Sequence, residues 1–288
     1  LAMKLKVYTL IFSLFIFSCS SDSDDNNDLS DNNSTNAILV SKITYNDSKN
    51  PNYSYEEEFH YDGNKIKDIS KTTYSNNSAL SLSVTVFNYT NDLISRIDYL
   101  TDNKHTLLRL FKYDSQSRRV TEINGCDDGH CTQKCTNGGC TTPYHYNSSF
   151  SYNSDGSVVS LIEIDNNKNK EYQQTFKLDN RGNIVDVFSD DDCEVETSLV
   201  YDNKNSPFKN VVGVNFSICY QGLFSDSPKV GFYNNILSYK ENSVCNNIPY
   251  KSYDVSFSYD YNQEEYPTKI VQTDSDGFKY TVLIEYNK

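Results

Sequence analysis

Apolar and polar residues alternate along much of the chain after residue 38. From Tyr253 to Tyr261 every odd position is apolar or aromatic and every even position is polar, and the stretch from Leu80 to Val86 alternates in the same way. This period of two predicts strands with one buried and one wet face, which suits antiparallel pairing. The 24 Tyr and 15 Phe, beside one Met and no Trp, also favour strands over helices.

A repeat runs through these strands. Each copy is a strand ending in an aromatic or apolar residue, then Asp or Asn, a turn and a second strand. The seven copies begin at Tyr61, Tyr89, Tyr113, Tyr152, Leu178, Tyr201 and Tyr259. Asp or Asn opens a turn through side-chain hydrogen bonds and Gly or Asn supplies positive φ, so each copy predicts a hairpin. We therefore expect an all-β antiparallel meander of about 14 strands, curled into a barrel or a strongly curved sheet.

These tyrosine–aspartate turns resemble the YD repeats of Rhs-type proteins. The chain resembles more closely a group of Bacteroidota surface lipoproteins of unknown function with a porin-like barrel fold. The segments that carry this likeness are Tyr201–Val211, Asn234–Leu237 and Tyr266–Ile270. The chain departs from the pattern at Leu178 and in a cysteine-rich insertion. The resemblance implies the fold and a surface location, and it implies no activity.

The start of the chain reads as a lipoprotein signal. Lys4 and Lys6 precede the 11-residue apolar run Val7–Phe17, which Ser18 and Cys19 follow. The run is too short for a transmembrane helix, which needs about 20 apolar residues, and typical of a signal peptide. We expect a signal peptide over residues 1–18 and a lipid on Cys19, which anchors the protein to the membrane. An ordinary secretory signal is the alternative.

Residues 19–37 are mostly Ser, Asp, Asn and Thr. Such a segment cannot bury enough apolar area to offset its ordering entropy, so we expect a disordered acidic tether. The acidic residues after Cys19 are also similar to the signal that sends Bacteroidota lipoproteins to the outer face of the outer membrane, although a plain solvated linker would look the same. The net charge of −13 argues against nucleic-acid binding, which needs a basic surface.

Residues 38–288 should form one β domain with insertions at about 124–146 and 207–250. A barrel of about 14 strands is too wide for its own side chains to fill. The second insertion, whose Gly231–Lys240 part could form a short helix, is a candidate plug. We do not expect a lipid-spanning porin, because the strands are too polar.

Four cysteines lie in the first insertion with symmetric spacing. The pairs Cys126–Cys140 and Cys131–Cys135 would close a hairpin at its neck and tip, since disulfides are the default outside the cytoplasm. Other pairings remain open. A zinc site built from the four thiolates, or from three of them and His130, is the alternative, although its gaps differ from those of zinc knuckles.

Three further cysteines follow, namely Cys193, Cys219 and Cys245. The odd number leaves one thiol free, and we favour the pair Cys219–Cys245 because both residues lie in the second insertion. A reactive catalytic cysteine is the alternative. It lacks a His partner nearby in sequence.

Two acidic segments, Asp190–Asp192 and Asp274–Gly277, carry the oxygen ligands that calcium prefers, but turns explain them equally well. The run Glu56–Glu58 could supply the paired carboxylates of a glycosidase. Neighbouring strand residues point to opposite faces, however, which favours a charged edge. We therefore name no catalytic residue, no metal site and no cofactor.

The expected function is a lipid-anchored cell-envelope lipoprotein, a non-enzymatic binding or structural module at the cell surface. Its tyrosine-rich faces could take a glycan, a peptide or a partner protein, because each ring offers an apolar face and a hydroxyl. The alternative for these rings is the core of a sheet without Trp. An extracytoplasmic hydrolase with its site on the insertions is the alternative function, and a shell that encloses another polypeptide is a third.

Overall fold

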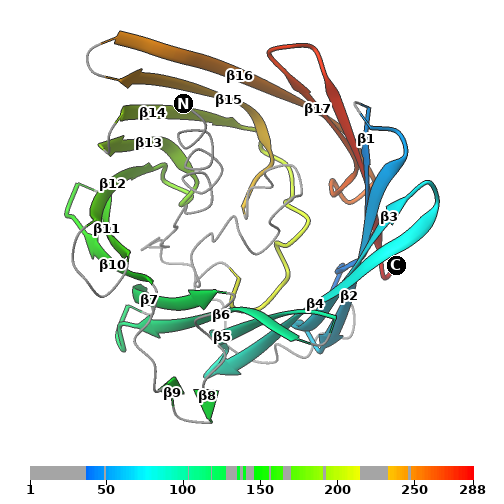
Figure 1. The fold of residues 1–288 in the computed structure, drawn as a ribbon, viewed down its shortest axis with the longest axis horizontal. Helices are drawn as coiled ribbons and strands as arrows, with labels where there is room; N and C mark the ends of the chain where they lie inside the picture. Colours follow the sequence, from blue (N-terminus) through cyan, green and yellow to red (C-terminus); the bar gives the residue numbers. More distant parts are fainter. Residues whose placement is uncertain are drawn as a thin grey trace.

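The chain forms a closed barrel of 16 antiparallel strands in the computed structural model (Figure 1). The described residues are 37–48, 50–102, 104–117, 119–127, 135–136, 139–140, 146–155, 157–164, 170–190, 193–214, 233–245 and 248–288. The strands are β1 (Val40–Asp47), β2 (Tyr53–Asp62), β3 (Lys65–Ser75), β4 (Ser78–Thr90), β5 (Leu93–Thr101), β6 (Lys104–Tyr113), β7 (Val120–Asp127), β8 (Cys135–Thr136), β9 (Gly139–Cys140), β10 (Tyr146–Tyr152), β11 (Ser157–Ile164), β12 (Lys170–Leu178), β13 (Ile184–Asp190), β14 (Cys193–Tyr201), β15 (Ile236–Cys245), β16 (Ile248–Tyr261), β17 (Pro267–Asp274) and β18 (Lys279–Tyr286).

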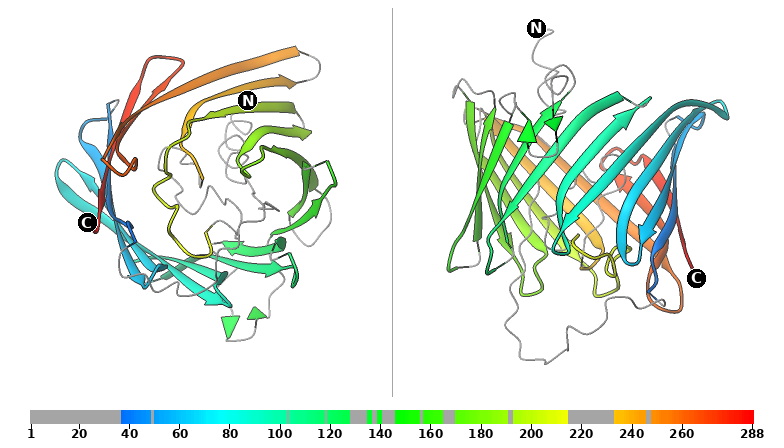
Figure 2. Two further views of the ribbon diagram at one scale, coloured as in Figure 1. Left: turned by 180° about the vertical axis from the view of Figure 1, so that it is seen from behind. Right: turned by 90° about the horizontal axis from the view of Figure 1, so that it is seen from below.

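Each barrel strand pairs with its neighbours in the chain, and β1 pairs with β18 to close the barrel. The strands β8 and β9 form a separate two-stranded sheet between β7 and β10, and they lie outside the barrel wall (Figure 2). Closure pairs the strand edges that would otherwise invite aggregation. The expected antiparallel meander and barrel are therefore confirmed. Within the described ranges, no helix is long and apolar enough to cross a membrane.

The barrel contains eight hairpin units, where the sequence predicted seven units and about 14 strands. The eighth unit is split between the two ends of the chain. The Asn287 N–H donates to the Leu39 carbonyl at 3.0 Å, and Tyr286 pairs with Val40. In the other units, too, the residue at the end of one strand pairs with a residue at the start of the next. No contiguous hairpin motif marks this unit, so the sequence pattern could not reveal it.

The last contiguous copy also lies two residues later than expected. The Asn262 N–H donates to the Tyr266 carbonyl at 2.9 Å, and Tyr261 pairs with Pro267. The turn therefore belongs to Tyr261-Asn262 and not to Tyr259-Asp260. Tyr259 does not open the turn. Its hydroxyl instead donates to the Ile236 carbonyl of the neighbouring unit at 2.6 Å.

Several of the repeated tyrosines tie one unit to its neighbour. The Tyr113 hydroxyl donates to the Ile94 carbonyl at 2.7 Å, the Tyr152 hydroxyl to the Val120 carbonyl at 2.8 Å, and the Tyr286 hydroxyl to the Pro267 carbonyl at 2.8 Å. The acceptors belong to a ring of buried residues, each the first or second residue of one of eight strands, namely Val40, Ile66, Ile94, Val120, Val158, Ile184, Ile236 and Pro267. A buried tyrosine needs such an acceptor for its hydroxyl, which explains the recurring tyrosine.

The apolar face of the strands points into the barrel and the polar face points out. Along β16, Val255 and Phe257 are buried, whereas Ser256, Ser258 and Asp260 are exposed. The buried rows of successive strands form one hydrophobic core inside the wall. A barrel of 16 strands is nevertheless too wide for its wall residues to fill alone.

Part of the chain between β14 and β15 fills one end of the barrel. The segment 202–214, which we call the plug, runs across the barrel interior (Figures 1 and 2). Phe208, Val211 and Val214 join the hydrophobic core, and the Phe208 ring lies 5.8 Å from the Phe59 ring. The insertion is shorter than the expected 207–250, because barrel strands resume at Ile236, and the expected helix over Gly231–Lys240 is wrong, since β15 occupies its second half.

Candidate functional site

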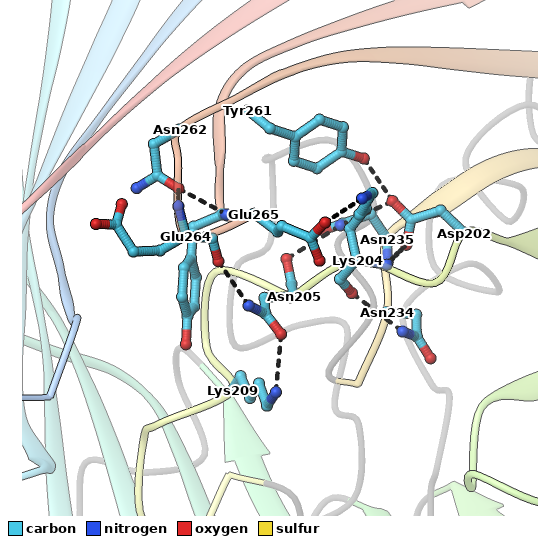
Figure 3. A network of polar contacts seen from close by, with 11 residues as sticks. Asp202, Lys204, Asn205, Lys209, Asn234, Asn235, Tyr261, Asn262, Glu264 and Glu265 are labelled. Carbon is cyan, nitrogen blue, oxygen red and sulfur yellow. Dashed lines mark hydrogen bonds and ion pairs between the residues drawn. The ribbon is translucent and has the colours of Figure 1, made fainter.

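Asp202, the residue after β14, holds the two ends of the insertion together (Figure 3). Its Oδ1 accepts the N–H groups of Lys204 at 3.0 Å and Asn235 at 2.9 Å. Its Oδ2 accepts the Asn235 side-chain amide at 3.0 Å and the Tyr261 hydroxyl. Burial, reinforced by this hydrogen bond, raises the pKa of Tyr261 well above its usual value, so the phenol stays a donor. Both oxygens of the carboxylate are thus occupied twice.

The plug is also fixed to the turn between β16 and β17 (Figure 3). The Lys204 ammonium pairs with Glu265, and the Asn205 amide donates to the Glu264 carbonyl at 2.8 Å. Lys209 donates to the Asn205 side-chain oxygen at 2.8 Å. These bonds hold the first half of the plug on one side of the barrel mouth.

The second half of the plug reaches the next turns around the mouth. The Asn210 amide donates to the Ile38 carbonyl at 3.0 Å, and the Val212 N–H donates to the Asn64 carbonyl at 2.9 Å. Gly213 has a φ of +83°, and a Cβ on it would lie 2.8 Å from the Asp92 carbonyl oxygen. The plug therefore bridges several turns, and its glycine is required by close backbone packing.

A pocket of about 400 Å³ opens beside this network. Its lining comes from the β12–β13 turn, the end of β14 and the residue before Asn235, namely Asp179, Asn180, Arg181, Asn183, Val185, Leu199, Val200, Tyr201, Asp202 and Asn234. The volume lies within the range of about 300–1,000 Å³ that is usual for small-molecule sites. We take this pocket as the candidate functional site.

The polar wall of the pocket is held rigidly. The Asp179 Oδ1 accepts the N–H groups of Arg181 at 2.9 Å and Asn183 at 2.8 Å, and its Oδ2 accepts the Asn183 amide at 3.0 Å. The Asn183 amide also donates to the Asn234 side-chain oxygen at 3.1 Å, and the Asn234 amide donates to the Lys204 carbonyl. This chain of bonds joins the β12–β13 turn to the Asp202 network.

Arg181 stands at the edge of this wall. It is exposed, and its Nη1 lies 3.4 Å from the Asn234 side-chain oxygen. The apolar part of the lining comes from Val185, Leu199, Val200 and Tyr201, of which Leu199 is buried and Val200, on the other face of β14, is exposed. The pocket thus combines a planar cation and fixed amides with an apolar surface.

Several residues singled out in the sequence fall elsewhere. Cys19, Cys131 and Cys219 lie outside the described residues. Cys126 is on β7, and Cys135 lies opposite Cys140 in the backbone pairing of β8 with β9. Their side chains are not part of the described structure, so the two expected pairs stay predictions.

Cys245 is disulfide-bonded. Cys193 lies directly opposite it in the pairing of β14 with β15. The pair Cys219–Cys245 expected from the sequence is not tested by the described residues, and the strand register favours Cys193 as the partner of Cys245.

The acidic candidates do not form a site among the described residues. Glu57 is buried inside the wall, while Glu58 is exposed, as strand alternation requires. The Asp274 carboxylate accepts the N–H groups of Asp276 at 3.1 Å and Phe278 at 2.9 Å, so it stabilises a turn. No group of three or more potential metal ligands occurs in the described ranges.

The tyrosine-rich faces contribute to the interior of the barrel. Tyr45 stacks on Tyr55 with ring centroids 4.7 Å apart and on Tyr280 at 5.8 Å, and the Lys71 ammonium lies 3.9 Å from the Tyr55 ring centroid. Tyr55 is fully buried. These rings therefore pack mainly against one another.

The sequence did not point to the pocket. Asp179-Asn180-Arg181-Gly182 was visible as a turn, and Asn234-Asn235 as part of a resemblance. Their partnership needs the β12–β13 turn beside the end of the insertion, more than 50 residues away in the chain. A conspicuous arginine in an otherwise acidic and amide-rich turn was the one available signal.

Comparison with known proteins gives likenesses of fold only. No family model matches the chain, and no curated protein matches it. A porin-like protein from Bacteroides uniformis is 8% identical with a TM-score of 0.42, over 86% of this chain and 96% of that one. A porin-like protein from Bacteroides vulgatus is 13% identical with a TM-score of 0.45, over 87% and 99%. TcdB2-TccC3 is 10% identical with a TM-score of 0.25, over 77% of this chain and 15% of that one.

Scores this low support no inference about activity. The function must therefore be argued from the residues of this barrel, and membership of the lipoprotein family that the motifs resemble stays a prediction.

Proposed function

We propose that this chain is a non-enzymatic envelope protein that serves as a binding module at the cell surface. In this proposal the barrel wall is exposed to water, and a lipid on Cys19 holds the protein to the outer membrane. The observation that carries the proposal is the polarity of the barrel wall. Most of its apolar side chains face the interior, and its outer face carries carboxylates and hydroxyls beside scattered apolar residues such as Leu82 and Phe188.

The outer face of a membrane-spanning barrel has the opposite composition. Such barrels present an apolar band about 25 Å tall to lipid, between two aromatic girdles. Here the outward positions of β16 include Asp254, Ser256 and Asp260, and those of β14 include Glu194 and Glu196, all of them exposed. Placing these carboxylates in hydrocarbon would be costly, so the wall favours an aqueous location.

A barrel in water needs a separate anchor, and the signal sequence offers one in Cys19. The tether would join the barrel at its plugged end. There the Asn287 side-chain amide donates to the Ala37 carbonyl at 3.2 Å, and its oxygen accepts the Leu39 N–H at 3.0 Å. In this arrangement the lipid carries the attachment and the barrel wall stays in contact with water.

Detergent-phase partition of the full chain tests the proposal. Cells producing the wild type, Cys19→Ala or the control Ser20→Ala are labelled with tritiated palmitate and extracted with a detergent that separates into two phases. We expect label and detergent-phase recovery for the wild type and the control, and an unlabelled protein in the aqueous phase for Cys19→Ala. Recovery of Cys19→Ala in the detergent phase would show that the barrel itself enters lipid.

A further inference from the structure

We infer that the pocket between the β12–β13 turn and the end of β14 binds a neutral saccharide. The inference deepens the proposed binding role by naming the ligand class and the residues that contact it. The ligand class follows from the hydrogen-bonding groups of the pocket that are not already used in contacts within the protein.

Most polar atoms of the wall are already used. Asp202 accepts four hydrogen bonds and Asp179 accepts three. The amide of Asn234 both donates and accepts within the network. These residues give the pocket its shape, and they have little capacity left for a ligand.

Arg181 and Asn180 have that capacity. The Arg181 guanidinium makes one long contact of 3.4 Å with a described residue, and the Asn180 side chain is exposed and has no hydrogen-bond partner among the described residues. A guanidinium has five donors in a fixed fork, and an amide supplies both donors and an acceptor. Together they match a ligand that accepts and donates hydrogen bonds at adjacent positions, as vicinal hydroxyl groups do.

The charge of the site argues against ionic ligands. Two carboxylates and one guanidinium line the pocket, and the whole chain carries a net charge of −13, so an anion gains little there. A cation would need free carboxylate oxygens, but those of Asp202 and Asp179 are occupied by N–H and O–H donors. A neutral, hydroxyl-rich molecule requires neither a positively charged site nor free carboxylate oxygens.

The apolar side of the pocket completes the match. Val200 lines it beside Arg181 and is 54% exposed, whereas Leu199, on the opposite face of β14, is buried. A pyranose ring has C–H groups on its faces and hydroxyls around its rim. It can lay one face on Val200 while its rim reaches Arg181 and Asn180.

The backbone of the site is rigid before any ligand arrives. Asp179 fixes the N–H groups of Arg181 and Asn183, and Asn234 joins this turn to the plug. Binding would therefore order chiefly the Arg181 and Asn180 side chains, which keeps the entropic cost low.

Calorimetric titration of the full-length protein in detergent tests the inference. The probes are neutral oligosaccharides built from glucose, mannose, galactose or N-acetylglucosamine, and a galacturonate oligomer as the acidic counterpart. We expect at least one neutral probe to bind. Arg181→Ala should weaken it about 10- to 100-fold, as expected for one hydrogen bond to a charged group, and Asn180→Ala should weaken it less.

Arg119→Ala is the matched control. Arg119 lies on the equivalent turn between β6 and β7, outside the pocket, with its guanidinium over the Tyr152 ring at 5.0 Å. This variant should bind as the wild type does. Absence of binding to every neutral probe, equal effects of Arg181→Ala and Arg119→Ala, or tighter binding of the galacturonate oligomer would each overturn the inference. Lipidation at Cys19 is read separately by the partition experiment, so anchoring and saccharide binding can fail independently.

Discussion

Replacement of Asp202 by Asn is the sharpest test of how the plug is held. The two side chains have the same shape, so the substitution changes only charge and hydrogen-bonding capacity. Oδ1 can still accept the N–H groups of Lys204 and Asn235. The new amide nitrogen, however, faces the Asn235 side-chain amide, which is also a donor.

The loss of stability in Asp202→Asn follows from the hydrogen bonds that the substitution removes. A hydrogen bond to a charged group contributes about 1.5–3 kcal/mol. The Tyr261 hydroxyl can rotate and accept from the new amide. One N–H of the Asn235 amide, in a residue with no exposed surface, loses its acceptor, while the amide still donates to the Asn205 carbonyl at 3.1 Å. We expect a loss of about 2–4 kcal/mol in the free energy of unfolding. Asp202→Ala should cost more, because the two N–H groups lose their acceptor as well.

Guanidinium unfolding followed by circular dichroism measures the effect, with a second probe to check two-state behaviour. A domain of this size shifts by about 2 °C per kcal/mol, so Tm should fall by about 4–8 °C. The control is Asp186→Asn, whose carboxylate on the outer wall accepts from Ser198 at 3.1 Å and should contribute about 0.5 kcal/mol. Equal stability of the two variants would refute the role of Asp202 as the hub of the plug.

Three further measurements test other parts of the structure. Gly213→Ala should destabilise the barrel by about 1–3 kcal/mol because its backbone is left-handed and the Asp92 carbonyl leaves no room for a Cβ; unchanged urea unfolding would contradict this. Non-reducing peptide mapping should find a disulfide between Cys245 and Cys193, its neighbour in register. The loop that this disulfide closes implies about 4 kcal/mol of stabilisation in a chain-entropy model. A disulfide-linked Cys219–Cys245 peptide would contradict this pairing. Burial raises the pKa of Tyr253 to about 12, so its neutral form is favoured in the fold and stability should fall as pH rises from about 10 to about 12; a titration midpoint near pH 10 for this tyrosine in an intact barrel, read by absorbance at 295 nm, would exclude this.

The local elements were predictable because their causes are local. Alternation in Tyr253–Tyr261 gives a strand with one buried face wherever that strand lies, and Asp62-Gly63 or Asn91-Asp92 favours a turn through its own backbone preferences. The positive φ of Gly63, Asn91 and Asp92 confirms this expectation. The class of fold followed from many such hairpins in succession.

The candidate site was not predictable in the same way. Its parts are Asp179–Asn183, Leu199–Asp202 and Asn234, which sequence separates by up to 55 positions and the barrel places around one pocket. In sequence, Arg181 is the basic residue of an otherwise acidic and amide-rich turn, and nothing near it in the chain links it to a pocket. It becomes a candidate ligand contact only because the apolar end of β14 lies across from it.

The sequence by itself determined the strands, the turns, the inward apolar face and the acidic outer face, because side-chain alternation and turn chemistry act between near neighbours. Only the tertiary structure decided that there are eight units, since the last unit joins Tyr286-Asn287 to Leu39-Val40 across the whole chain. It also decided which part of the insertion fills the barrel. Closure and plugging depend on contacts between distant segments, and their free energy comes from area buried jointly, which no local pattern records.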